Sequence, residues 1–197
     1  MPAKMEAPAT IRARKAVMWT REDCRKIEAA GLMPDRWELV EGEIISRMGT
    51  RVPRSMIVSR MLFWLSDVFP KDFVLPFCGI DVHPDDNPIN EPTPDLTVLN
   101  SPSKELELDR NPGPAEIALL VEVSDVTLDF DLGPKARLYA RAGIPEYWAL
   151  DIHARVVHQH REPSPSGYNF RRIVTGATTL SPLAKPDATL TASEIFE

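Results

Sequence analysis

The sequence predicts an α/β domain in which a mixed β-sheet is flanked by helices. Residues 117–123 (IALLVEV) form an almost continuous apolar run, which is typical of a strand buried on both faces. Helical patterns lie before and after it, and further short runs have the composition of strands. The resulting order of hairpin, helix, strands, helix and strands indicates a mixed sheet with helices packed on it.

Local signals define the elements at the start of the chain. A helix N-cap at Thr20 and a stop at Gly31 predict a short helix over 21–30. The segment 37–48 has the sequence WELVEGEIISRM, in which Gly42 is a natural turn between two short strands. This segment therefore predicts a β-hairpin.

The remaining elements follow from periodicity and from proline. Residues 55–69 carry apolar side chains near i, i+4 and i+8, which predicts an amphipathic helix. A second long helix is expected over 132–141. Pro76 places its strand at an edge of the sheet or at a bulge, and the unbroken apolar run makes 117–123 the central strand. The expected strands cover 72–82, 95–99, 117–123, 146–152, 155–160 and 168–174, with 95–99 and 146–152 beside the central one.

Length and composition indicate one globular domain. The chain has 197 residues, of which 43% are hydrophobic and 26% charged. We expect a flexible basic arm over 1–18 and a single domain over 19–197. Cys24 and Cys78 are far apart and form no CxxC pair, which favours a reduced, cytoplasmic protein. No apolar run approaches the roughly 18 residues of a transmembrane helix, so no membrane partner is expected.

Charge is unevenly distributed along the chain, whose net charge is −6. Residues 1–30 hold seven Lys or Arg and four Asp or Glu, a net of +3. Residues 81–131 hold thirteen Asp or Glu and two Lys or Arg, a net of −11. An acidic chain is a poor non-specific ligand for nucleic acid, because phosphate contacts need cations. The carboxylates suit a hard divalent cation, although most of the thirteen fit a solvated acidic loop better.

Two carboxylates stand out because of their positions in expected strands. Asp95 follows Pro94 at the start of a strand, and Glu122 is the only charged residue in IALLVEVS. An ionised Glu in an apolar strand is costly unless it is paired or binds a metal. Carboxylates on neighbouring strands can share one Mg²⁺ and hold it beside a phosphate. The alternative is that Glu122 lies at the strand end and meets solvent or an arginine.

Seven sequence blocks occur in a characteristic order from about Arg36 to Phe196. They are WELVEGE (37–43), TPDLTV (93–98), LVEVS (120–124), DLGPK (131–135), LY (138–139), GIPEYW (143–148) and LD (150–151). This series resembles the Uma-two family, a bacterial group of restriction endonucleases within the PD-(D/E)XK nuclease superfamily. The resemblance implies a restriction-endonuclease-like fold and hydrolysis of phosphodiester bonds in DNA with Mg²⁺ or Mn²⁺.

The resemblance also implies roles for individual residues. Asp95 matches the Pro-Asp of the family and Glu122 matches the acid of the (D/E)XK motif, so both would bind the metal. Ser124 stands where that motif has its lysine, and Lys135 on the following helix matches a lysine that the family places there. Asp131 lies four residues before Lys135, on the same helix face, and would hold the ammonium in place. Without the resemblance, Lys135 would be interpreted as a solvated helix lysine.

Three further residues are candidates on the basis of the resemblance. Glu43, with Glu38 as the other candidate, matches the acidic residues of the leading hairpin and would complete the metal shell. The alternative is a surface glutamate beside the turn. Arg54 stands near the start of the first long helix, where the family often has a histidine. Arginine in place of this histidine either weakens cleavage or provides a side chain that binds a phosphate.

Three histidines close to one another raise the alternative of a zinc site. His158 and His160 are two residues apart on an expected strand and therefore share a face, and His153 is near in sequence. The sequence shows no cysteine or other close ligand to accompany them. A polar, exposed strand face explains the pattern better.

The sequence supports a working hypothesis and a rival. In the first, Asp95 and Glu122 hold Mg²⁺ or Mn²⁺, Lys135 orients the attacking water, and the basic arm touches the backbone of DNA. The rival is a catalytically weak or inactive protein that keeps the nuclease fold as a nucleic-acid or protein binding module. Ser124 and Arg54 keep this rival open. A homodimer would fit an enzyme that cuts both strands.

Overall fold

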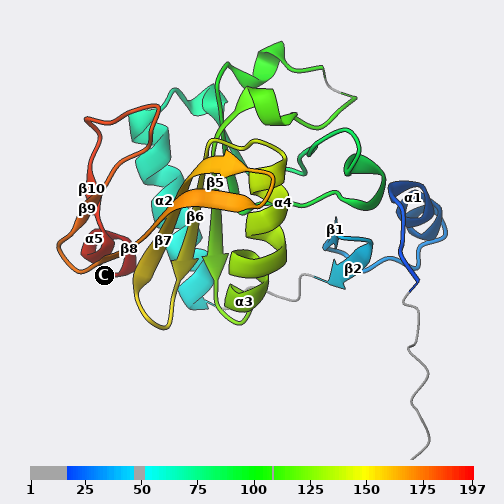
Figure 1. Ribbon diagram of the computed structural model, residues 1–197, viewed down its shortest axis with the longest axis horizontal. Helices are drawn as coiled ribbons and strands as arrows, with labels where there is room; N and C mark the ends of the chain where they lie inside the picture. Colours follow the sequence, from blue (N-terminus) through cyan, green and yellow to red (C-terminus); the bar gives the residue numbers. More distant parts are fainter. Residues whose placement is uncertain (1–16, 47–51, 108) are drawn as a thin grey trace, which may run out of the picture.

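The computed structural model describes residues 17–46, 52–107 and 109–197 (Figure 1). Most of the arm expected over 1–18 lies outside these residues. The helices are α1 (Arg21–Ala29), α2 (Val52–Val68), α3 (Leu128–Phe130), α4 (Ala136–Arg141) and α5 (Ala192–Phe196). Short helical turns are η1 (Lys71–Phe73), η2 (Asn87–Ile89), η3 (Ser103–Glu105), η4 (Pro114–Glu116) and the π-helical turn η5 (Asp131–Lys135). The strands are β1 (Trp37–Val40), β2 (Glu43–Ser46), β3 (Val74–Pro76), β4 (Leu96–Leu99), β5 (Ile117–Ser124), β6 (Glu146–Asp151), β7 (Val156–Ser164), β8 (Gly167–Thr175), β9 (Thr179–Leu180) and β10 (Leu190–Thr191).

A six-stranded mixed sheet organises the molecule, in the order β3-β4-β5-β6-β7-β8. Strands β5 and β6 are parallel, and every other neighbouring pair in this sheet is antiparallel. A parallel pair requires a crossover, which α3, η5 and α4 supply. The mixed sheet is therefore confirmed, as is the central position of β5 between β4 and β6. The strand expected over 72–82 is shorter, and β3 with Pro76 forms one edge of the sheet.

Helices cover both faces of the sheet (Figure 1). On one face, Leu119 and Val121 of β5 belong to a core cluster with Met61 and Leu65 of α2. On the other face, Leu120 belongs to a cluster that includes residues of α4. Side chains alternate between the faces of a strand, so Glu122 shares the face of Leu120 and points toward the crossover helix.

The crossover begins earlier than the helix expected over 132–141 and contains a wider turn. Pro134 lies inside η5 and has no N–H to donate to the helical ladder. The ladder widens at this point, because the Ala136 N–H bonds to the Asp131 carbonyl, five residues back. This π-helical turn carries Asp131 at its start and Lys135 at its end.

The predicted hairpin is formed by β1 and β2, and it is tied to the main part of the chain. Glu41 and Gly42 form its two-residue turn with φ values of +52° and +75°, as a type I′ turn requires. Leu39 exchanges backbone hydrogen bonds of 3.2 and 2.7 Å with Glu91, in the loop before β4. This pairing brings β1, and with it Glu38, beside the start of β4.

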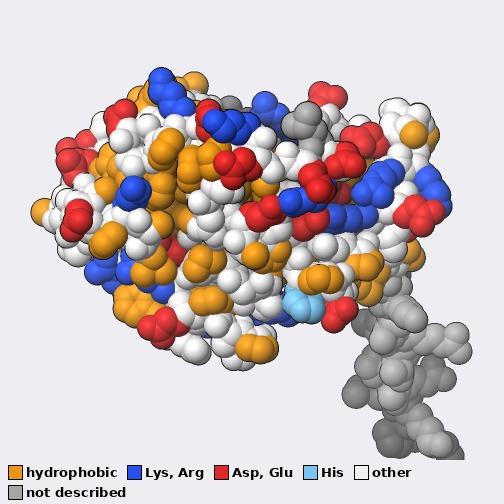
Figure 2. All heavy atoms as spheres, turned by 90° about the horizontal axis from the view of Figure 1, so that it is seen from above, with side chains coloured by type: hydrophobic (Ala, Val, Ile, Leu, Met, Phe, Trp, Pro, Cys, Tyr) orange, Lys and Arg blue, Asp and Glu red, His pale blue; other side chains and the backbone are white. Residues whose placement is uncertain are grey.

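Ion pairs with distant arginines neutralise part of the acidic segment 81–131. Arg21 lies 2.6 Å from Asp81, and Arg141 lies 2.8 Å from Asp86. Acidic and basic side chains are interspersed on the surface toward the end of the molecule that carries α1 (Figure 2). Part of the acidic excess is therefore neutralised by ion pairs within the fold. Among the described residues, no helix has the length and hydropathy needed to cross a membrane.

Candidate active site

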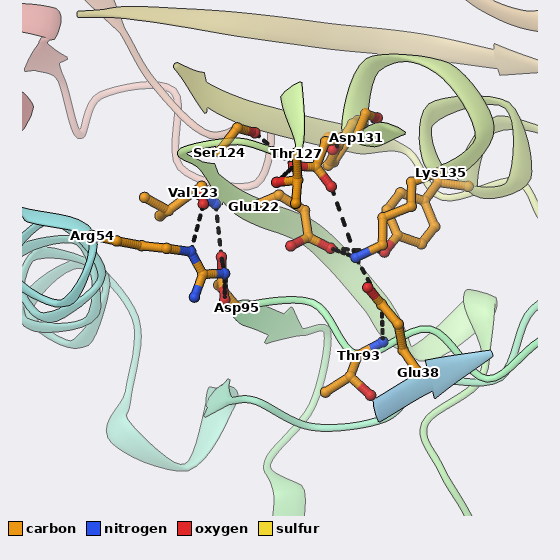
Figure 3. A network of polar contacts seen from close by, with 12 residues as sticks. Glu38, Arg54, Thr93, Asp95, Glu122, Val123, Ser124, Thr127, Asp131 and Lys135 are labelled. Atoms are coloured by element: carbon orange, nitrogen blue, oxygen red, sulfur yellow. Dashed lines mark hydrogen bonds and ion pairs between the residues drawn. The ribbon is translucent and has the colours of Figure 1, made fainter. Parts of the chain in front are cut away.

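The antiparallel pairing of β4 with β5 brings Asp95 and Glu122 to the same end of the sheet. Leu96 pairs with Val121, so Asp95, the residue before β4, lies next to the last residues of β5. Figure 3 shows the two carboxylates between Arg54 on one side and Lys135 on the other. Both carboxylates are buried, with Asp95 at 0% and Glu122 at 2% exposure.

Asp95 is held by the backbone of β5 and by α2. The Val123 N–H donates to Asp95 Oδ2 at 2.8 Å. Arg54 Nη2 lies 2.6 and 2.7 Å from the two Asp95 oxygens, and Arg54 Nε donates to the Val123 carbonyl at 2.8 Å. The guanidinium of Arg54 thus contacts three oxygen atoms that converge at this end of the sheet.

Lys135 reaches Glu122 from the crossover helix. Its Nζ lies 2.7 Å from Glu122 Oε1, 2.8 Å from Glu38 Oε2 and 3.9 Å from Asp131 Oδ1. The lysine side chain is only 2% exposed, so the interpretation as a solvated helix lysine is wrong. The sequence-based expectation that Lys135 lies beside Glu122, with Asp131 close to it, agrees with this geometry.

The leading hairpin contributes Glu38 to this cluster, and the structure does not bring Glu43 into it. Glu38 is 4% exposed, and its Oε2 also accepts a hydrogen bond of 3.1 Å from the Thr93 N–H. Glu43 is exposed at the start of β2, where it pairs with Val40 across the turn. Strand β1 lies between β2 and the Glu91 loop. Packing against this loop turns Glu38 inward, whereas Glu43 lies on the outer strand beside the turn.

Asp131 occupies the inner side of η5 and is bound by two hydroxyl groups. Ser124 Oγ and Thr127 Oγ1 donate to Asp131 Oδ2 at 2.7 and 2.6 Å. Burial, and next the nearby Glu122, raise the pKa of Asp131 to about 7 against the opposing effects of Lys135 and the two hydroxyl groups. Ser124, which replaces the motif lysine, therefore positions the residue that accompanies Lys135.

The sequence arguments missed three groups in this cluster. From the sequence, Ser124 is only a replacement for the motif lysine, and no role is predicted for Thr127 or Tyr139. The Tyr139 hydroxyl donates to Glu122 Oε1 at 3.0 Å. The spacing of Asp131, Lys135 and Tyr139 by four residues could have indicated a shared helix face.

The donor atoms of the cluster determine which metal ion it can hold. Within residues 17–46, 52–107 and 109–197, no group of three or more His, Cys, Asp or Glu side chains is arranged to hold one. The histidine zinc alternative thus gains no support, and His153 instead lies 2.9 Å from Asp125. Mg²⁺ needs fewer side chains, because it retains waters and binds substrate phosphates. Asp95, Glu122 and the Val123 carbonyl provide the oxygen donors that it prefers.

Comparison with known proteins places the chain in a family. The sequence profile of the Uma2 family, described as "Putative restriction endonuclease", matches residues 26–193. The chain belongs to the Uma2 family. This confirms the resemblance drawn from the seven sequence blocks.

A solved structure supports the fold of this Uma2 protein. The crystal structure of "a putative nuclease belonging to DUF820" from Anabaena variabilis ATCC 29413 matches with a TM-score of 0.64 at 14% sequence identity. The match covers 86% of this chain and 96% of that chain. A search of curated proteins gave no match. The restriction-endonuclease-like mixed sheet flanked by helices is thus shared with a structure of very different sequence.

Proposed function

We propose that this Uma2 protein is an endonuclease that hydrolyses phosphodiester bonds in DNA with the help of Mg²⁺ or Mn²⁺. The observation that carries the proposal is the 2.7 Å contact between Lys135 Nζ and Glu122 Oε1, next to Asp95 on the neighbouring strand. A lysine from a helix would thereby replace, beside this acid, the strand lysine that the motif has at position 124. The family membership agrees with this chemistry.

Asp95 and Glu122 would hold the cation, with the Val123 carbonyl as a further oxygen donor. When bound, the cation supplies a water of lowered pKa and neutralises charge on the scissile phosphate. The chain prepares these oxygen atoms without the ion, because the Val123 N–H fixes Asp95 and the Tyr139 hydroxyl fixes Glu122. Arg54 would release Asp95 to the cation or turn to a phosphate oxygen, which its planar fork suits.

Lys135 would orient the attacking water and stabilise negative charge that develops on the phosphate. Glu38 and Asp131 hold its ammonium from two sides, so little reorganisation is needed during the reaction. Its burial among protein groups strengthens such electrostatic effects relative to water. Glu38 therefore supports the lysine, and we do not assign it to the metal.

A second candidate function is a nuclease fold used for binding without cleavage. The observation that favours it is the contact of Arg54 with both Asp95 oxygens, at 2.6 and 2.7 Å. A guanidinium at this position competes with a divalent cation for the same carboxylate. Under this alternative the protein binds DNA or another protein and leaves it uncut.

Cleavage of DNA by the purified protein distinguishes the two functions. Supercoiled plasmid and labelled single- and double-stranded DNA are incubated with Mg²⁺, Mn²⁺ or a chelator. We expect cleavage that requires the metal and is lost in Asp95→Asn and Glu122→Gln, which keep one hydrogen-bond acceptor each. The matched control is Asp81→Asn, which breaks the Arg21 ion pair outside the cluster and should cut normally. Equal cleavage by all three variants, or none by the wild type, contradicts the nuclease proposal.

A further inference from the structure

A small cavity lies between α4 and the β7–β8 hairpin, apart from the Asp95–Glu122 cluster. Its volume is about 130 Å³, and Arg137, His160, Ser166 and Arg171 are among the residues that line it. None of the described residues that line the cavity is an Asp or Glu. The cavity therefore presents two guanidinium groups, an imidazole and a hydroxyl in a chain whose net charge is −6.

His160 is a buried polar side chain whose hydrogen bonding is incomplete. The residue is 6% exposed, and its Nδ1 has no hydrogen-bond partner among the described residues. Its ring packs edge-on against Tyr147 and Tyr168, with centroid distances of 5.6 and 5.5 Å. Burial, and next the nearby Arg171, lower the pKa of His160 to about 4, so the imidazole is neutral. Native structures rarely leave such a buried group without a partner.

Arg171 is held against the hairpin opposite this histidine. His160 and Arg171 are direct cross-strand neighbours in the register of β7 and β8, which places their side chains on the same face. Arg171 Nε donates to the Tyr168 carbonyl at 2.8 Å. A Cβ atom at Gly167 would lie 2.9 Å from Arg171 Nη2, so the glycine leaves the space in which the guanidinium sits.

The two arginines at the cavity differ from half of the ten other arginines that the structure describes, those paired with carboxylates. Arg21, Arg54, Arg110, Arg141 and Arg161 all pair with carboxylates. In the part of the chain that the structure describes, Arg137 and Arg171 form no such ion pair. Within the described residues, no carboxylate is paired with their positive charge and none lines the cavity.

We propose that this cavity binds a phosphate group between Arg137, His160 and Arg171. The guanidinium fork matches phosphate oxygens in pairs, and the neutral imidazole and the Ser166 hydroxyl can donate further hydrogen bonds. The volume is well below the roughly 300 Å³ of a pocket for a larger ligand. A single tetrahedral phosphate fits this size, either as the free ion or as part of a nucleic-acid backbone.

This site is separate from the proposed nuclease centre. Lys135 and Arg137 are two residues apart, about 200° around the helix axis, so they project from different sides of the crossover. The phosphate site does not depend on metal binding or on cleavage. It can therefore be tested in the presence of a chelator.

The test follows the ring resonances of His160 by NMR, assigned with His160→Gln, during titration with inorganic phosphate at constant pH and ionic strength. We expect saturable shifts, and an affinity at least about tenfold lower in Arg137→Gln and in Arg171→Gln, since each loses charged hydrogen bonds. Both arginines are exposed, so these variants should fold. Arg25→Gln, an exposed residue of α1, removes the same charge elsewhere and should bind as the wild type does.

A second titration with a short DNA duplex, again in chelator, identifies the source of the phosphate. Shifts of His160 with inorganic phosphate alone assign the site to the free ion, and shifts with the duplex alone assign it to a backbone phosphate. No shift with either ligand, or shifts that persist unchanged in Arg171→Gln, overturn the proposal. Failure of the nuclease proposal would leave these results unaffected, because no cleavage occurs in chelator.

Discussion

The Lys135 ammonium is almost inaccessible to solvent and lies among carboxylates from three elements: Glu38 of β1, Glu122 of β5 and Asp131 of η5. A lysine on a helix with a polar sequence would ordinarily be expected in solvent. Because Lys135 is buried, its substitution is expected to lower the stability of the protein. Alanine at an exposed helix position is well tolerated, whereas removal of one partner from a buried ion pair is strongly destabilising.

Lys135→Met should therefore lower the free energy of unfolding by about 3–5 kcal/mol, because Glu38 and Glu122 would remain buried without their cation. Urea denaturation measures this change. Lys26→Met is the matched control, since the Lys26–Glu22 pair is exposed and should contribute less than about 1 kcal/mol. If the two variants lose similar stability, the Lys135 cluster is not the buried network described above.

Arg54 should control how strongly the protein depends on a divalent cation. In Arg54→Gln the buried Asp95 carboxylate loses the guanidinium that lies 2.6 Å away, which destabilises the protein in chelator. Bound Mn²⁺ would replace that charge, and a ligand specific to the folded state raises its stability. We expect a larger increase in melting temperature with Mn²⁺ in Arg54→Gln than in the wild type. An equal or smaller increase would show that the arginine and the cation do not share Asp95.

Asp131 should make stability depend on pH. Its pKa is about 7 in the folded protein and 3.8 as the ordinary value, so the folded state binds the proton more tightly. The contribution is fully present below about pH 4 and is lost as the pH rises through about 7. Asp131→Asn keeps an acceptor for Ser124 and Thr127 but cannot titrate. Urea denaturation across this range should give a flatter profile for the variant, and an unchanged slope would remove Asp131 as the cause.

At the level of elements, the β1–β2 hairpin depends on its turn. Gly42 has a φ of +75°, and a Cβ atom there would lie 2.9 Å from Met18 Cβ. Gly31 has a similar φ of +69° but nothing within 4 Å of such an atom. Gly42→Ala should cost about 1–3 kcal/mol of stability from backbone strain, and more than Gly31→Ala because of the contact with Met18. Equal losses in thermal or urea unfolding would show that the contact is relieved without cost.

Local patterns predicted the elements where one physical signal dominates. The apolar run of β5 indicated a strand buried on both faces, and Gly42 indicated the hairpin turn. The crossover was less predictable, because Pro134 converts part of an otherwise regular helical pattern into a π-helical turn. The edge strand β3 is short because the chain leaves the sheet after Pro76, which local composition does not reveal.

Across the whole molecule, the resemblance to a family indicated the candidate site, and long-range packing determines which side chains meet there. Asp95, Glu122 and Lys135 could be named from the sequence blocks. The choice between Glu38 and Glu43 could not be made, because it depends on how β1 packs against the Glu91 loop. The hydroxyl groups of Thr127 and Tyr139 were missed for the same reason, since their partners are set by the fold.

The central claim is that Asp95 and Glu122 hold a divalent cation beside Lys135. Anomalous scattering from crystals grown with Mn²⁺ tests it directly, because the ion is located without reference to activity. We predict a manganese peak in contact with the carboxylate oxygens of both Asp95 and Glu122, and with the Lys135 ammonium still next to Glu122. Crystals that show no peak at these carboxylates at saturating Mn²⁺, or a peak only elsewhere on the protein, would contradict the account.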